Sequence, residues 1–103
     1  MEYNKLVRDK IPEMIVQEGY IPETEILSNE KFLQELDKKL REEVNEYCES
    51  GDAEEIADIL EVLYAICDAR GYSFDEVMKI KEEKKSKRGG FSKKIFLIAK
   101  HEK

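Results

Sequence analysis

The strongest constraint on the fold is a pair of neighbouring segments, 29–49 and 53–69, in which apolar residues recur at helical spacing. In the first segment they lie three and four positions apart, which places them on one face of an α-helix. The second segment has a similar stripe and is apolar around most of its circumference. The stripe of the first segment comprises Phe32, Leu33, Leu36, Leu40, Val44 and Tyr47.

The residues that flank these segments are typical of helix ends. Ser28 or Asn29 is a favoured N-cap for the first helix, and Asp52 is one for the second. Gly51 suits the left-handed backbone that commonly ends a helix. Because only the short segment 49–52 separates the two helices, we predict that they form an antiparallel hairpin.

Shorter elements are predicted before the hairpin. The segment 1–28 contains both prolines of the chain, and we expect an extended stretch at 3–7 and a helix of about ten residues from Asp9. A second extended stretch is expected at 24–27. The two stretches either pair as a minor strand pair or wrap around the helices.

After the hairpin, we predict a third helix from Ser73 to about Lys87 and then an apolar element over 91–99 that is either helix or strand. Charged residues make up 41% of the sequence, and with plentiful aliphatic residues this favours amphipathic helices over disorder. A chain of 103 residues can bury one modest core. The predicted fold is therefore a single all-α domain over 1–103, a central antiparallel helical hairpin with flanking helices.

Several classes of function are disfavoured. The net charge of −6 argues against nucleic-acid binding, which needs surplus Lys and Arg to neutralise phosphates. No apolar run reaches the roughly 18 residues of a membrane span, and no signal peptide is evident, so we expect a cytoplasmic protein. Cys48 and Cys67 share no CxxC spacing, and we expect free, buried thiols.

Three carboxylates of the hairpin stand at or beside positions where a charge is costly. Glu43 lies within the apolar stripe of the first helix, Glu46 lies at its edge, and Glu55 projects into the stripe of the second helix. If the hairpin turns in the middle of 49–52, Glu46 faces Glu55 and Glu43 faces Asp58. Because residues three apart share a helix face, all four carboxylates can converge on one point.

Four carboxylates in a partly buried space repel one another unless a cation compensates them. Mg²⁺ first, and Mn²⁺ next, suit such a set of oxygen ligands, so we predict a Mg²⁺ site there. Because the chain has 24 acidic residues, an ordinary solvated acidic face is the alternative. Glu42 and Glu54 are predicted to be surface residues, and Glu61, one turn beyond Asp58, is a candidate for a fifth ligand.

These motifs resemble those of a known superfamily. The sequences EEVNE (42–46) and EEIAD (54–58) are similar to the E-x-x-E…E-x-x-D signature of the all-α nucleoside triphosphate pyrophosphohydrolases. That superfamily includes MazG, the phosphoribosyl-ATP pyrophosphohydrolases and the dimeric dUTPases. The motifs YNKLVRDKIP (3–12) and KRGGF (87–91) resemble the MazG-like, phosphoribosyl-ATP pyrophosphohydrolase-like branch in particular. The resemblance covers nearly the whole chain.

By this resemblance, Glu43, Glu46, Glu55 and Asp58 would be the catalytic Mg²⁺ ligands, and the reaction would convert a nucleoside triphosphate into a monophosphate and pyrophosphate. The expected role is house-cleaning of non-canonical nucleotides. Cleavage between the α- and β-phosphates needs neutralised phosphate oxygens and an activated water, which carboxylate-held Mg²⁺ can supply. Glu46 is the candidate for accepting the proton of that water.

Two alternatives share the fold. A catalytically silent regulatory or partner-binding module would have the same helices without metal-dependent turnover. A phosphoribosyl-ATP pyrophosphohydrolase of histidine biosynthesis would share the chemistry and differ in substrate. Eight residues separate Glu46 from Glu55, which leaves little loop for base recognition, so neither base nor sugar is predicted.

Six basic residues are candidates for binding the phosphates of the substrate. Three flank the start of the first short helix, and three precede the Gly89-Gly90 pair. Lys and Arg are the usual phosphate partners, although pairing with Glu on a solvated helix is the alternative for the later group. The candidates are Lys5, Arg8, Lys10, Lys84, Lys87 and Arg88.

The apolar circumference of the helix at 53–69 also bears on assembly. A helix that is apolar all round must be buried on every side, which a monomer of 103 residues can barely achieve. We therefore predict a homodimer or homotetramer with this helix near the interface, and the family resemblance points the same way.

Overall fold

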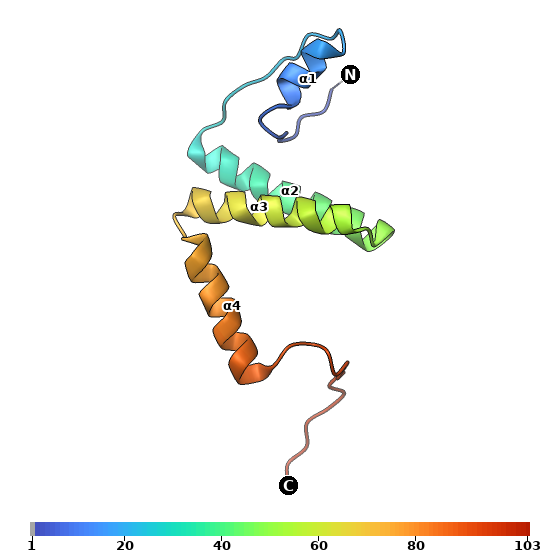
Figure 1. Cartoon of the computed structure of the whole chain (residues 1–103), viewed down its shortest axis with the longest axis vertical. Coiled ribbons are helices and arrows are strands. Elements are labelled where there is room, and N and C mark those ends of the chain that lie inside the picture. The colour runs from blue at the N-terminus through green and yellow to red at the C-terminus, as the bar shows by residue number, and fades with distance from the viewer. Residues whose placement is uncertain (1) are drawn as a thin grey trace. The chain divides into compact units, whose positions relative to one another are not determined.

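The computed structural model describes residues 2–103, and within them the chain forms four helices and no strand (Figure 1). The helices are α1 (Ile11–Gln17), α2 (Asn29–Ser50), α3 (Ala53–Arg70) and α4 (Phe74–Arg88). The predicted all-α class is therefore confirmed. None of the helices in this range is long and apolar enough to span a membrane.

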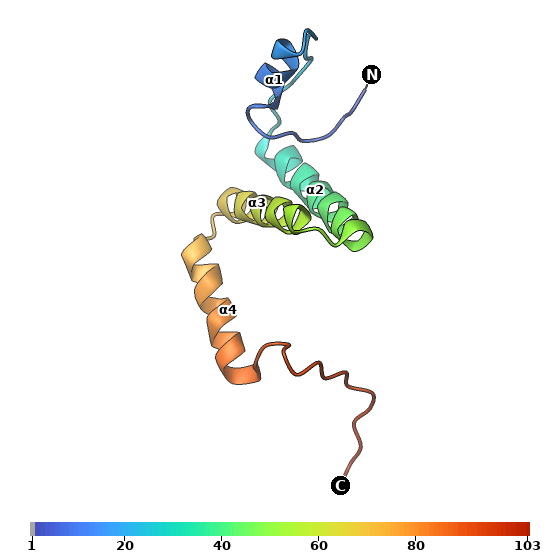
Figure 2. The ribbon, with the colours of Figure 1, turned by 45° about the vertical axis from the view of Figure 1, so that its right-hand side comes forward.

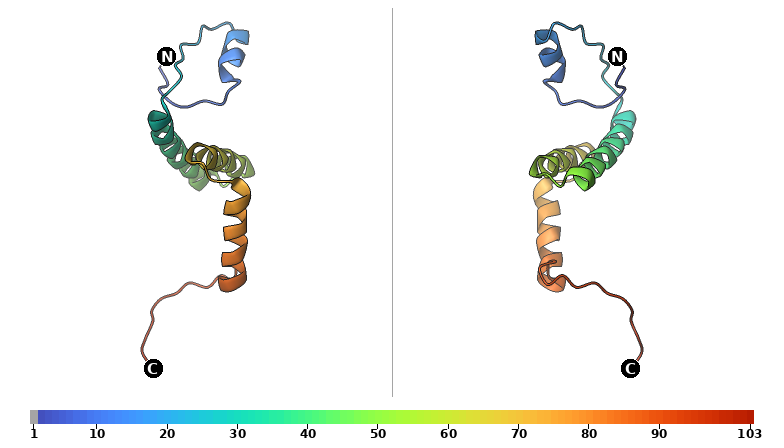
Figure 3. Two further views of the ribbon diagram at one scale, coloured as in Figure 1. Left: turned by 90° about the vertical axis from the view of Figure 1, so that its left-hand side faces the viewer. Right: turned by 90° about the vertical axis from the view of Figure 1, so that its right-hand side faces the viewer.

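The chain divides into two units, Met1–Tyr72 and Ser73–Lys103. In the first unit, α2 and α3 lie side by side and antiparallel, as the successive views of Figures 2 and 3 show. This is the predicted helical hairpin. It carries the core of the unit and positions the candidate site.

The hairpin begins and turns at the predicted residues. The side chain of Ser28 accepts a hydrogen bond from the backbone N–H of Lys31, which caps α2. Gly51 has a φ of +69°, and its N–H donates to the carbonyl of Tyr47 at 2.7 Å. That left-handed backbone is costly for other residues, so Gly51 ends α2 sharply and lets α3 start at Ala53.

The buried core of the described residues is small. Leu36 of α2 and Val62 of α3 are its buried hydrophobic side chains, at 4% and 8% exposure, while many apolar residues of α3 are exposed. Cys48 and Cys67 are free, as predicted, but neither is fully buried: Cys48 is exposed and Cys67 is half-buried. The two-helix contact covers one face of each helix, so side chains elsewhere on the hairpin stay open to solvent.

The N-terminal part of the first unit is less regular than predicted. The helix α1 has 7 residues instead of about ten, because it begins where Pro12 can occupy the first turn. The stretches 3–7 and 24–27 contain no strand. The helix α1 makes no packing contact with α2 or α3. Ion pairs from Lys5 and Arg8 instead connect the N-terminal segment to the hairpin.

The second unit contains α4 and the residues that follow it. Ser73 caps α4 by accepting a hydrogen bond from the N–H of Glu76, and the helix ends at Arg88, one residue beyond the predicted end at about Lys87. The prediction of helix or strand for 91–99 was wrong: these residues form neither, and Phe96 is 87% exposed. A strand requires a hydrogen-bonding neighbour, and residues 73–103 provide none.

Candidate metal centre

The hairpin brings three of the four predicted carboxylates together. One oxygen from each of Glu43 on α2 and Glu55 and Asp58 on α3 lies within 4.8 Å of the other two. Oxygens around a six-coordinate Mg²⁺ at about 2.1 Å from the metal are roughly 3–4.2 Å apart. The three carboxylates, called the acidic cluster below, are therefore close to the spacing that such a cation needs.

Glu43 is the buried member of the acidic cluster. Only 6% of it is exposed, and within the described residues its Oε2 atom has no hydrogen-bond partner. Burial raises the pKa of Glu43, and the nearby carboxylate of Glu46 raises it further, while Lys39 opposes both. Since a buried oxygen without a donor is costly, Glu43 is the side chain that most needs a cation.

Lys39 partly compensates this charge, and the sequence reasoning missed it. Its Nζ lies 3.4 Å from Oε1 of Glu43 and 3.6 Å from Oε1 of Glu42. The signal was available, because Lys39 stands three and four positions before two glutamates of one helix. Its contact is with Oε1 of Glu43, so Oε2 still has no hydrogen-bond partner among residues 2–103.

Asp58 forms an ion pair with a residue outside the hairpin. The Nη2 atom of Arg8 donates to Oδ1 of Asp58 at 2.7 Å, and the side chains are 60% and 38% exposed. Arg8, predicted to bind phosphate, therefore contacts a carboxylate of the acidic cluster here. The N-terminal segment reaches the site through this contact.

The remaining acidic residues near the site are open or paired. Glu46 is exposed and stands outside the three-carboxylate set, although it is close enough to affect Glu43. Glu61 and Glu54 are exposed. Glu42 is not the open surface residue that we predicted: it is half-buried, and its Oε1 lies 3.7 Å from Nζ of Lys5.

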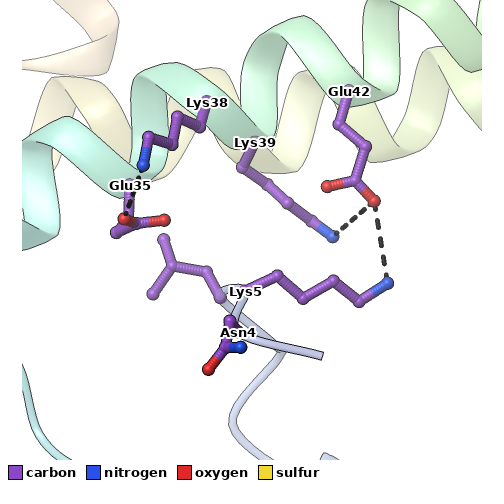
Figure 4. Close-up of a pocket in the computed structure, with 7 residues that line it drawn as sticks. Asn4, Lys5, Glu35, Lys38, Lys39 and Glu42 are labelled. Atoms are coloured by element: carbon purple, nitrogen blue, oxygen red, sulfur yellow. Dashed lines mark hydrogen bonds and ion pairs between the residues drawn. The ribbon is translucent and has the colours of Figure 1, made fainter. Parts of the chain in front are cut away.

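A pocket of about 160 Å³ lies beside this region, between residues 4–6 and α2 (Figure 4). Lys5, Lys38 and Lys39 line it together with Glu35 and Glu42. Figure 4 shows the ion pairs that join these lysines to the two glutamates. The pocket is therefore lined by three ammonium groups, each already paired with a carboxylate, and one of them, that of Lys39, also contacts Glu43.

The other basic candidates lie elsewhere in the chain. Lys10 is exposed and directly precedes α1. Lys84, Lys87 and Arg88 are exposed in the last turns of α4, in the second unit. Their assignment to substrate binding stays a prediction.

Comparisons with protein-family models, with curated proteins and with solved structures found no match to this chain. The resemblance of its motifs to the all-α pyrophosphohydrolases therefore also stays a prediction. The geometry of the acidic cluster is the independent ground for proposing a function.

Proposed function

We propose that this chain is a Mg²⁺-dependent nucleoside triphosphate pyrophosphohydrolase that acts at the acidic cluster. The observation that carries the proposal is the buried Oε2 of Glu43, which has no hydrogen-bond partner in the described part of the chain and belongs to a group of three converging carboxylates. A divalent cation satisfies that oxygen and offsets the repulsion among the carboxylates. Mn²⁺ is the second candidate, since it accepts the same oxygen ligands.

Each carboxylate has a role in this proposal. Glu43, Glu55 and Asp58 hold the metal, which when bound neutralises phosphate oxygens and makes water a better nucleophile. Glu46 is exposed beside Glu43, so it can complete the metal site or accept the proton of the attacking water. The products are a nucleoside monophosphate and pyrophosphate.

The substrate phosphates are proposed to bind on the side of the cluster where the N-terminal segment contacts the hairpin. Arg8 and Lys5 approach the hairpin at Asp58 and Glu42, and guanidinium and ammonium groups bind phosphate well. Lys10, Lys84, Lys87 and Arg88 are further candidates. The role we propose is removal of non-canonical nucleotides in the cytoplasm.

We also propose that the chain assembles as a homodimer or homotetramer through the hairpin. Ile56, Leu60 and Leu63 of α3 are 42%, 52% and 37% exposed, and Val44 and Tyr47 of α2 are each 39% exposed. A stable interface needs about 800 Å² from each partner, and these exposed apolar side chains of the hairpin are the surface that we propose for it.

The test is a screen of nucleoside and deoxynucleoside triphosphates with Mg²⁺, together with phosphoribosyl-ATP, that measures pyrophosphate release. The expected result is release that depends on Mg²⁺ and stops with a chelator. Selective turnover of phosphoribosyl-ATP would instead indicate the histidine-biosynthesis enzyme. Absence of turnover with every substrate, by a folded chain that binds Mg²⁺, would refute the enzyme and favour the silent module.

A further inference from the structure

The Arg8–Asp58 contact places a cation of the chain on a carboxylate that the proposed metal also needs. The contact joins residues 50 positions apart, at 2.7 Å, from the N-terminal segment to α3. Asp58 supplies one of the three converging oxygens of the acidic cluster. Arg8 and a divalent cation therefore compete for the charge of Asp58, because each is stabilised by the same carboxylate.

We propose, resting on the function above, that Arg8 is an exchangeable counterion that couples metal binding to triphosphate binding. Without substrate, Arg8 pairs with Asp58 and opposes metal binding. When a triphosphate arrives with its Mg²⁺, Asp58 turns to the metal and Arg8 turns to the phosphate oxygens. The Arg8–Asp58 ion pair is thus replaced by a contact of Asp58 with the metal and a contact of Arg8 with the phosphate. Both side chains keep a partner of opposite charge.

The exposure of the two side chains makes this exchange feasible. Arg8 is 60% and Asp58 38% exposed, so the pair is solvated and contributes little to stability. The buried oxygen that has no hydrogen-bond partner in the described chain belongs instead to Glu43, which is 6% exposed and keeps its need for a cation whichever partner Asp58 has. Glu43 therefore attracts the metal whether or not substrate is present. Arg8 makes the affinity for the metal depend on substrate.

The coupling predicts effects of opposite sign from one substitution. Arg8→Gln removes the competitor, so Mg²⁺ alone should bind about two- to fivefold more tightly, the effect of one exposed ion pair. The same substitution removes a charged phosphate donor, so inorganic tripolyphosphate with Mg²⁺ should bind about tenfold more weakly or worse. A contact that only fastens the N-terminal segment would not tighten Mg²⁺ binding.

A matched control exists in the same unit. Nη2 of Arg70 on α3 lies 4.0 Å from Oδ2 of Asp37 on α2, a second Arg–Asp pair that involves no residue of the acidic cluster. Arg70→Gln removes the same charge and a longer ion pair with an aspartate, one without a hydrogen bond. It should change neither affinity, whereas a general effect of net charge would move both variants alike.

The experiment is isothermal titration of the full chain and both variants, first with Mg²⁺ alone and then with tripolyphosphate at saturating Mg²⁺. Tighter Mg²⁺ and weaker tripolyphosphate binding by Arg8→Gln alone support the proposal. Unchanged or weaker Mg²⁺ binding by Arg8→Gln, or equal shifts in both variants, overturns it while leaving wild-type pyrophosphate release intact. A wild-type chain that binds no Mg²⁺ overturns both this inference and the proposed function.

Discussion

The hairpin α2–α3 and the helix α4 both contain many acidic and basic residues, but the surroundings of their glutamates differ. On α4, Glu82 is exposed and 3.1 Å from Nζ of Lys81, and this neighbour lowers the pKa of Glu82. On α2, burial raises the pKa of Glu43, whose Oε2 has no partner in the described chain. The comparison teaches that charge density alone does not indicate a site, whereas a buried carboxylate that is only partly compensated does.

The largest expected effect is on catalysis. Glu43→Gln should lower Mg²⁺-dependent pyrophosphate release by at least about 100-fold, because the amide fills the same space without the charge that binds metal. Glu82→Gln, the same change on α4, should leave the rate unaltered. Steady-state assays of both variants, with circular dichroism to verify helical content, make the comparison. Equal losses in the two variants would remove the distinction between the regions.

A second expectation concerns stability in the presence of metal. Mg²⁺ at a hundredfold excess over its dissociation constant should raise the free energy of unfolding by about 2.7 kcal/mol. The increase should persist in Glu82→Gln and disappear in Glu43→Gln. Thermal unfolding with and without Mg²⁺ measures it, and a chain that responds equally with and without Glu43 would place the metal elsewhere.

The two regions should also differ in assembly. Leu60 on α3 and Ile80 on α4 are similarly exposed, at 52% and 53%, but only Leu60 lies on the helix proposed for the interface. Burying a charge in an interface is costly, so Leu60→Glu should reduce the mass in solution to that of a monomer. Ile80→Glu should not. Light scattering at micromolar concentration measures the mass of each variant, and a monomeric wild type would contradict the proposed assembly.

The smallest expected effect is on the pH dependence of metal-free stability. A raised pKa means that the contribution of Glu43 is fully present below its ordinary value of 4.5 and is lost as pH rises through the raised value. The lowered pKa of Glu82 acts in the opposite sense, because its contribution is present above 4.5 and is lost as pH falls through the lowered value.

Removing each group should therefore change the pH profile in opposite directions. At neutral pH without metal, Glu43→Gln should unfold at a higher temperature than wild type, because it relieves a buried charge. Glu82→Gln should unfold at a slightly lower temperature. Melting curves between pH 4 and pH 8 test both signs, and a lower melting temperature for Glu43→Gln at neutral pH would contradict the raised pKa.

Features that depend on neighbouring residues could be predicted from the sequence. The cap at Ser28, the left-handed turn at Gly51 and the apolar stripe that contains Leu36 are all local patterns. The hairpin register follows from them, and it brings Glu43 close to Asp58 as expected. Within the candidate site, the sequence therefore predicted which helix faces meet.

Other features could not be predicted from local sequence, because they depend on how distant segments of the chain approach one another. The contact of Arg8 with Asp58 spans 50 positions, and no local rule pairs those residues. The exposure of Glu46, the pairing of Glu42 with Lys5 and the irregular backbone of 91–99 likewise depend on which surfaces are covered. Helical spacing and caps act over a few residues, so the sequence by itself determined the helices and their register. Burial and long-range ion pairs depend on how distant segments approach, so only the tertiary structure decided that Oε2 of Glu43 is buried with no hydrogen-bond partner among residues 2–103.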